Sequence, residues 1–270
     1  MVTPANASGW KFKPAKEKNA PWNSVSANFA ALKTASEKAV SDSKVSENRE
    51  TDKKVSDNKT EDKKVSENKA EKKNVKRKVS ADDWRLILVN KQNPIPDDYE
   101  AVMVPVSGGI TIREEVAGPL MEMFEAAAKE GVTLTVCSGY RSHEHQQNLF
   151  DRKIRNYTGS GLSYLDAFRI GSYSVIIPGT SEHELGMAAD IVTPGYSTLN
   201  EGFANTEAGR WLKNNAFKYG FILRYPKGKE YITGITYEPW HFRYVGKEAA
   251  IDIKNADITL EEYIDELELY

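Results

Sequence analysis

The sequence contains very little cysteine and no long apolar run. Its one cysteine, Cys137, excludes a disulfide within the chain and, in the apolar run VTLTVC, is expected to be a small core residue rather than a nucleophile. No apolar stretch approaches the roughly 18–20 residues of a membrane-spanning helix, and the first residues lack an apolar signal core. We therefore expect either a cytosolic protein or one whose export segment is missing from this chain.

Residues 1–80 are poor in aromatic residues and rich in positive charge. They hold four of the 27 aromatic residues, and their 19 lysines and arginines against 11 aspartates and glutamates give a net charge of +8. Residues 81–270 hold 18 and 28 such residues, which gives −10. The two parts of the chain therefore differ in kind.

A short polar repeat runs through the first part. KVSEN or KVSDN recurs every ten residues, at 44–48, 54–58 and 64–68, a spacing that matches no coiled-coil repeat. One valine per ten residues buries too little apolar area to offset an ordering entropy of roughly 1–2 kcal/mol per residue. We predict a disordered basic tail or linker over 1–80 and a single folded domain over 81–270. The tail is either a solvated linker or a basic arm attracted to a polyanion; without a base-reading module, no nucleic acid is expected.

Two common hydrolase signatures are missing. His183-Glu184 opens the zinc-protease pattern HExxH, but Met187 stands where the second histidine belongs. The serine carboxypeptidase pattern Ser-x-x-Lys occurs only within the first 80 residues, and its companion Lys-Thr-Gly is absent. We therefore disfavour both classes.

Strand-like and helix-like patterns are mixed along the chain from residue 84 onward. Helices are predicted at 114–131, 143–157, 206–220 and 259–270, and strands at 84–90, 132–140, 188–194, 221–225 and 238–245. The stretch 156–180 is expected to be either a groove wall or a structural excursion. Because strands and helices do not follow strict βαβ alternation, the fold class is predicted to be α+β, with a central, mainly antiparallel sheet flanked by helices.

Two stretches place polar groups among small and apolar residues that are typical of a protein interior. They are SEHELGMAAD at 181–190 and EPWHFRYVG at 238–246. His183, Asp190 and His241 would supply the His, Asp and His donors that a catalytic zinc commonly takes, with the fourth position left to water. The alternative is that both histidines are ordinary polar residues near a sheet edge.

Glu238 is the group available to take a proton from that water. It lies three residues before His241, and positions three apart in a strand face opposite sides. A bend is therefore required, and Pro239 makes an irregular strand start plausible.

The two stretches resemble the zinc D-alanyl-D-alanine carboxypeptidases of the VanY type, whose pattern is Ser-x-His-x-x-Gly-x-Ala-x-Asp followed by Glu-x-x-His. The pattern is matched at Ser181, His183, Gly186, Ala188, Asp190, Glu238 and His241. A third family element, SGYRS at 138–142, carries Arg141. The resemblance covers about residues 84–269 and implies a fold of the hedgehog and D,D-peptidase kind.

The resemblance also implies roles for individual residues. His183, Asp190 and His241 would bind Zn²⁺, and Glu238 would act as general base and then pass the proton to the leaving amine. Arg141 would neutralise an oxyanion or hold the substrate carboxylate. Four further residues are expected to shape the site or contact substrate: Ser181, Trp240, Tyr140 and Gln147. Gly186 would permit a tight turn, and the neighbouring alanines close packing under the metal.

The function implied is removal of the terminal D-Ala from peptidoglycan stem peptides ending in D-Ala-D-Ala. We expect a monomeric bacterial enzyme acting outside the cytoplasm, at the cell wall or membrane, with the basic tail contacting an anionic wall polymer. The alternatives are an L,D-carboxypeptidase acting on the tetrapeptide stem and a non-catalytic module that binds wall peptides. The presence of Glu238 argues against the latter. Enzymes that cut L-alanyl-D-glutamate bonds rank third, because they usually lack the Trp-His-Phe-Arg-Tyr setting of His241.

Overall fold

A four-stranded antiparallel sheet forms the centre of the molecule. The computed structural model describes Ser80 and residues 83–268. The strands lie in the order β3 (Thr135–Ser138), β4 (Ala188–Val192), β6 (His241–Tyr244) and β5 (Phe221–Leu223). A separate antiparallel hairpin consists of β1 (Met103–Ser107) and β2 (Ile110–Arg113). Apart from Ser80, the predicted tail lies outside the described residues.

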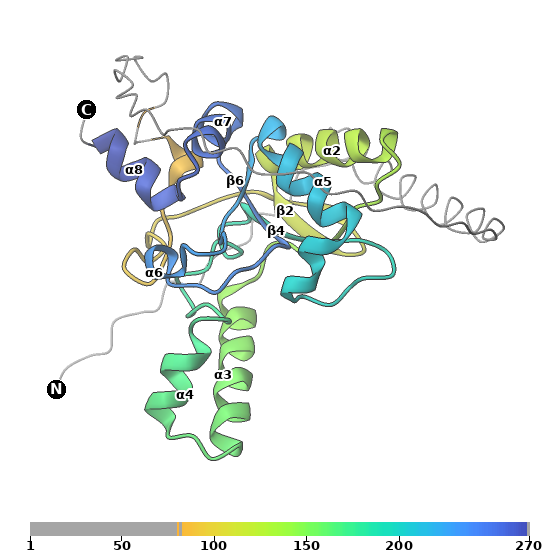
Figure 1. Ribbon diagram of the computed structural model, residues 1–270. Helices are drawn as coiled ribbons and strands as arrows, with labels where there is room; N and C mark the ends of the chain where they lie inside the picture. Colours follow the sequence, from red (N-terminus) through yellow and green to blue (C-terminus); the bar gives the residue numbers. More distant parts are fainter. Residues whose placement is uncertain (1–79, 81–82, 269–270) are drawn as a thin grey trace, which may run out of the picture.

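Helices surround the sheet, and one helical pair projects from it (Figure 1). The longer helices are α2 (Glu114–Lys129), α3 (His143–Gly159), α4 (Tyr164–Gly171), α5 (Glu207–Asn215), α7 (Lys247–Ala256) and α8 (Leu260–Glu268). Shorter turns are α6 (Glu230–Thr233) and the 3₁₀ helices η2 (Trp84–Leu86), η3 (Glu201–Asn205) and η4 (Ala216–Tyr219). The α3–α4 hairpin extends away from the sheet (Figure 1). Of the described helices, none has the length and apolar character needed to cross a bilayer.

The main hydrophobic core joins the sheet to α2 and α5. Helix α2 buries Val116, Leu120 and Met123, which recur three and four residues apart and so face one side of the helix. They belong to one cluster with Met187, before β4, and Leu212 of α5. This core fixes the position of β4, the strand that carries Asp190.

A second core cluster attaches the C-terminal helices to the edge strand β5. It contains Ile222 of β5, Ile253 of α7, and Leu260 and Tyr263 of α8. Because these side chains are buried, α8 is held against the body of the domain rather than left as a loose end.

The predicted α+β class with an antiparallel sheet is confirmed, and each of the four predicted helices overlaps an observed one. The predicted helix 206–220 divides into α5 and η4, and it stops at Gly220, whose φ of +88° suits glycine. The stretch 156–180 contains α4, which the sequence patterns did not reveal. The β1–β2 hairpin and α7 were also missed.

Two predictions were wrong. The segment 84–90 is not a strand: it begins with η2, and the carbonyls of Arg85 and Ile87 accept hydrogen bonds from the Arg243 side chain instead of a neighbouring strand. Cys137 is exposed, not a core residue. It lies on the edge strand β3, where Val136 faces the core and the next residue faces the opposite side.

Candidate metal centre and active site

Three neighbouring strands bring the predicted site residues together. Asp190 of β4 lies directly opposite His241 of β6, and Ser138 at the end of β3 pairs with Asp190 from the other side. His183 lies in the turn that precedes β4. Gly186 ends that turn with a φ of +69°, and a Cβ there would lie 2.5 Å from the Met103 sulfur, so the predicted tight turn is observed.

The donor atoms of His183, Asp190 and His241 converge in a buried cluster. Nε2 of His183 lies 3.2 Å from Asp190 Oδ2, and Nδ1 of His241 lies 3.1 Å from Asp190 Oδ1. One ligand atom from each residue lies within 4.8 Å of the others. Two ligands at about 2.0–2.1 Å from a tetrahedral zinc are about 3.3 Å apart, so the donor set and its spacing fit a zinc ion.

The two histidines present different ring nitrogens to Asp190. Nδ1 of His183 lies 2.7 Å from the Gly139 carbonyl, which can only accept, so Nδ1 carries the proton and Nε2 is free for a metal. The ring of His241 has the opposite orientation to that of His183: its Nδ1 faces Asp190, and its Nε2 faces Glu182 Oε2 at 3.5 Å.

Burial and neighbouring charges lower the pKa of His183 and raise that of His241. Burial, with the nearby Arg141 charge, lowers the pKa of His183 to about 4. Burial disfavours charge on His241 as well, but the neighbouring Asp190 and Glu182 carboxylates raise its pKa to about 9. Burial opposes ionisation of Asp190, yet the two histidines and Arg141 hold the pKa of its carboxyl well below the usual range. A carboxylate therefore lies between the rings.

Glu238 lies in the turn that leads into β6. The backbone N–H of His241 donates to the Glu238 carbonyl at 3.1 Å, which produces the bend predicted at Pro239. As a result, Glu238 Oε2 lies 3.8 Å from His241 Nδ1, on the donor side of the cluster. Burial raises the pKa of Glu238 to about 8, against the lowering effect of His241. A carboxyl group with such a pKa can both accept and return a proton near neutral pH.

Arg141 is placed at the rim of the cluster by the start of α3. The Ser142 side chain caps that helix by accepting from the His145 N–H, and Arg141 directly precedes this cap residue. Its Nη2 donates to Asp190 Oδ2 at 2.8 Å and its Nε to Ser138 Oγ at 3.0 Å. About a fifth of its side chain, 18%, is exposed, whereas that of Asp190 is buried.

The remaining predicted residues have different surroundings. Ser181 is fully buried, and its hydroxyl has no hydrogen-bond partner among the described residues. Tyr140 and Trp240 are half-buried, next to Arg141 and His241 in the chain. Gln147 is exposed on α3 and donates to Asp151 one turn further on.

The sequence patterns missed Glu182, which lies behind the cluster. Its Oε1 accepts from Arg224 Nε at 2.6 Å and Arg243 Nη1 at 2.9 Å, and Arg224 forms a two-fold ion pair with Glu261 of α8. The Glu182, Arg224 and Arg243 side chains are fully buried. The only sequence signal for Glu182 was its position next to His183, because the residues that contact it are 42 to 61 positions away in the chain.

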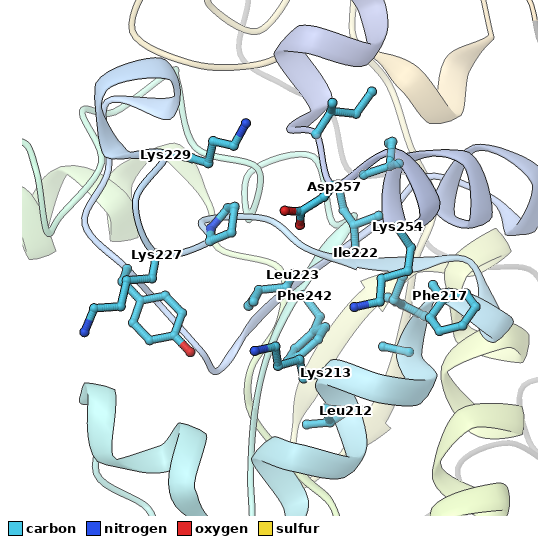
Figure 2. Close-up of a pocket in the computed structure, with 16 residues that line it drawn as sticks. Leu212, Lys213, Phe217, Ile222, Leu223, Lys227, Lys229, Phe242, Lys254 and Asp257 are labelled. Atoms are coloured by element: carbon cyan, nitrogen blue, oxygen red, sulfur yellow. The ribbon is translucent and has the colours of Figure 1, made fainter. Parts of the chain in front are cut away.

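A separate cavity of about 310 Å³ lies beside β5, α5 and α7 (Figure 2). Apolar side chains, including Leu212, Ile222 and Phe242, line it, and Lys213 and Lys254 lie at its edge (Figure 2). None of the predicted site residues lines this cavity, so the His-Asp-His cluster lies outside it.

Comparisons with known proteins agree on one family. The family model described as VanY, D-alanyl-D-alanine carboxypeptidase, matches residues 109–247, a range that contains every predicted site residue. A D-alanyl-D-alanine carboxypeptidase of Enterococcus faecalis (strain ATCC 700802 / V583) is 43% identical over 191 residues, which are 70% of this chain and 69% of that protein.

Solved structures show the same similarity. One is the vancomycin resistance D,D-pentapeptidase VanY from a VanB-type cassette, a mutant in complex with Zn(II). It has a TM-score of 0.62 and 43% identity, over 67% of this chain and 99% of that one. Another is the LD-carboxypeptidase LdcB, with a TM-score of 0.58 and 45% identity, over 66% of this chain and 84% of that one.

Proposed function

Because the chain belongs to the VanY family of D-alanyl-D-alanine carboxypeptidases, we propose that it is a zinc carboxypeptidase that removes the terminal D-Ala from peptidoglycan stem peptides ending in D-Ala-D-Ala. The observation that carries this proposal is the buried convergence of one carboxylate and two imidazoles beside Glu238. The proposed site of action is outside the cytoplasm, where the wall polymer lies.

Three side chains would hold the metal: His183 through Nε2, His241 through Nδ1, and Asp190 through its carboxylate. A zinc ion bound there supplies Lewis acidity, which polarises the scissile carbonyl and lowers the pKa of water to about 7 in favourable sites. Two of these ligands are also hydrogen-bonded to other groups of the chain: the Gly139 carbonyl accepts from His183 Nδ1, and Arg141 donates to Asp190.

Glu238 and Arg141 would perform the remaining chemistry. Glu238 Oε2 takes the proton of the attacking water and returns it to the nitrogen of the leaving D-Ala. Arg141 supplies fixed positive charge, either to the oxyanion formed at the scissile carbonyl or to the terminal carboxylate of the peptide. Its partial exposure and its contact with Asp190 suit both tasks.

Four residues are proposed to shape the peptide groove rather than react. Ser181 and Trp240 flank the ligands His183 and His241 in the chain, and Tyr140 precedes Arg141. Gln147 is exposed on α3 and would contact the stem peptide.

The LdcB similarity supports a second candidate, an L,D-carboxypeptidase that removes D-Ala from a tetrapeptide. The same ligands and base serve both reactions, because the bond cut is an amide to a terminal D-Ala in each case. The two candidates differ only in the residue before the scissile bond, D-Ala or the L-centre of a diamino acid.

The deciding experiment compares the two stem peptides. The purified chain with Zn²⁺ is incubated with a pentapeptide ending in D-Ala-D-Ala and, separately, with the tetrapeptide, each with and without a chelator. Released D-Ala is quantified by mass spectrometry. We expect chelator-sensitive release from the pentapeptide and little from the tetrapeptide.

The other outcomes are equally informative. Release from the tetrapeptide alone would transfer the assignment to the L,D-carboxypeptidases. No release from either peptide by protein shown to contain zinc would favour a wall-peptide-binding module or an endopeptidase.

A further inference from the structure

Two polar atoms face each other at the back of the candidate metal site with no other partner. Glu182 Oε2 and His241 Nε2 are both buried, and neither has a hydrogen-bond partner among the described residues. They lie 3.5 Å apart, at the outer limit of a hydrogen bond. A buried carboxylate oxygen and a buried imidazole nitrogen left unpaired would each be costly, so each is the natural partner of the other.

The orientation of the His241 ring means that Glu182 faces the ring nitrogen that does not point toward the metal site. Its Nδ1 faces Asp190 and Glu238, so Nδ1 is the nitrogen that a metal would use and Nε2 is the nitrogen left over. An imidazole can bind a metal at Nδ1 only when the remaining proton is on Nε2. A carboxylate that accepts from Nε2–H fixes this tautomer and the angle of the ring.

Glu182 is itself held rigidly. Its Oε1 accepts from Arg224 and Arg243 at 2.6 and 2.9 Å, which leaves only Oε2 for His241. Arg224 is anchored further by Glu261 of α8, at 2.6 and 2.8 Å. The two acids and two arginines balance in charge, which makes their burial tolerable.

We propose that Glu182 is a positioning residue for the metal site: it holds His241 with Nδ1 toward the metal, and Arg224, Arg243 and Glu261 hold Glu182. This inference rests on the proposed metal site and adds to it a buried connection that runs from α8 to a metal ligand. It assigns no role in substrate contact to Glu182.

The first test uses the unaltered 270-residue chain, loaded with Zn²⁺ and labelled with ¹⁵N. The chain has only four histidines, so long-range ¹H–¹⁵N spectra of the rings are simple to interpret. We expect one metal-bound ring with a protonated Nδ1, which is His183, and one with a protonated Nε2, which is His241. Binding of His241 through Nε2 would overturn the proposal.

The second test measures Zn²⁺ affinity by competition with a chromophoric chelator. In Glu182→Gln the side-chain oxygen remains held by two guanidiniums, so the amide N–H₂ group faces His241 Nε2 and two donors oppose each other. We expect the Kd for Zn²⁺ to rise about 10–100-fold, the usual effect of losing such a partner of a metal ligand.

Glu184→Gln is the matched control, because it neutralises another buried carboxylate of the same turn, whose oxygens contact the Gly179 N–H and His143 rather than His241. It should lower the melting temperature of the metal-free protein while changing the Kd for Zn²⁺ by less than about threefold. Equal weakening by both variants, or wild-type affinity in Glu182→Gln, would refute the proposal. If Glu182→Gln does not fold, the spectra of the unaltered chain decide.

These readouts are independent of turnover. A chain that binds Zn²⁺ with His241 in the expected tautomer but releases no D-Ala would disprove the proposed reaction and leave the role of Glu182 intact.

Discussion

The environment of Glu238 changes the proton affinity of its carboxyl group. As a surface carboxyl group it would be ionised and a weak base at neutral pH, but burial raises its pKa to about 8. His241 and Arg141 oppose this effect, and a bound cation would oppose it further. The residue is thus placed where a proton can be taken up and released during one turnover.

Replacing Glu238 by Gln should remove this proton transfer while preserving shape. We expect kcat for D-Ala release to fall about 10²–10⁴-fold, the usual contribution of a general base, with Zn²⁺ still bound. The control is Glu248→Gln, which changes an exposed carboxyl group on α7 and should retain wild-type kcat. Full activity in Glu238→Gln would show that another group takes the proton.

The pKa shifts of His241 and Glu238 predict that Zn²⁺ affinity depends on pH. With pKa values of about 9 and 8, both groups are protonated at pH 6 in the metal-free protein. A metal at Nδ1 must displace the His241 proton and favours ionised Glu238, so bound protons compete with Zn²⁺. Affinity should therefore increase as the pH rises from 6 toward 9.

Calorimetry in buffers of different ionisation enthalpy measures this effect directly. Between one and two protons should be released per Zn²⁺ bound at pH 7, and fewer at pH 9. An affinity independent of pH from 6 to 8 would mean that neither group carries a proton in the metal-free protein.

Among the structural elements, the turn at 182–186 does the most to assemble the site. Within five residues it directs Glu182 toward the buried arginines and His183 toward the metal donors. The turn closes with the Gly186 N–H donating to the His183 carbonyl, and the Gly186 carbonyl accepts from the backbone of Arg113 at 2.9 Å. The β1–β2 hairpin, which the sequence patterns did not reveal, therefore supports the turn.

Gly186→Ala should destabilise the protein more than a glycine change at an open position. A φ of +69° costs a non-glycine residue about 1–2 kcal/mol, and the Cβ contact with Met103 adds about 1–3 kcal/mol of overpacking. Gly195→Ala is the matched control, since its φ is +83° but no atom lies within 4 Å of the new Cβ. It should show only the first cost.

Urea unfolding of the two variants and the unaltered chain gives the comparison. Equal losses of unfolding free energy at Gly186 and Gly195 would mean that the Met103 side chain moves aside without cost.

At the scale of the whole molecule, the chain combines a part with a charge of +8 over residues 1–80 and a part with −10 over 81–270. The described residues contain the complete candidate site, so catalysis should not need the first part. We propose that the basic part increases contact with an anionic wall polymer.

Removing residues 1–79 tests whether the basic part contributes to polymer binding but not to catalysis. We expect kcat/KM on a soluble pentapeptide to stay within about twofold, while salt-sensitive binding to a teichoic acid polymer is lost. Sedimentation of each chain with the polymer, at low and high salt, is the measurement, and the same sedimentation experiments report whether the protein is the expected monomer. Retained binding in the shortened chain would assign the contact to the folded domain.

Local sequence patterns were enough to predict the candidate donor set, the proposed general base and the fold class. These depend on local relations: seven residues from His183 to Asp190 span one turn and one strand, and three from Glu238 to His241 span a bend at proline. Short spacings of this kind restrict geometry strongly, because the chain between the residues has few conformations. The periodicity of 114–131 similarly predicted α2, since one face of that helix had to be buried.

Long-range packing was needed to show which face of β3 is open, and so why Cys137 is exposed. It was also needed to show that the Arg243 side chain, and not strand pairing, holds 84–90. It alone joined Glu182 to Arg224, Arg243 and Glu261. Apolar periodicity reports that a residue is buried but not against what, and a buried ion pair between distant positions leaves no periodic pattern. The contacts that orient His241 therefore arise from the way β5, β6 and α8 pack, which no local stretch of sequence contains.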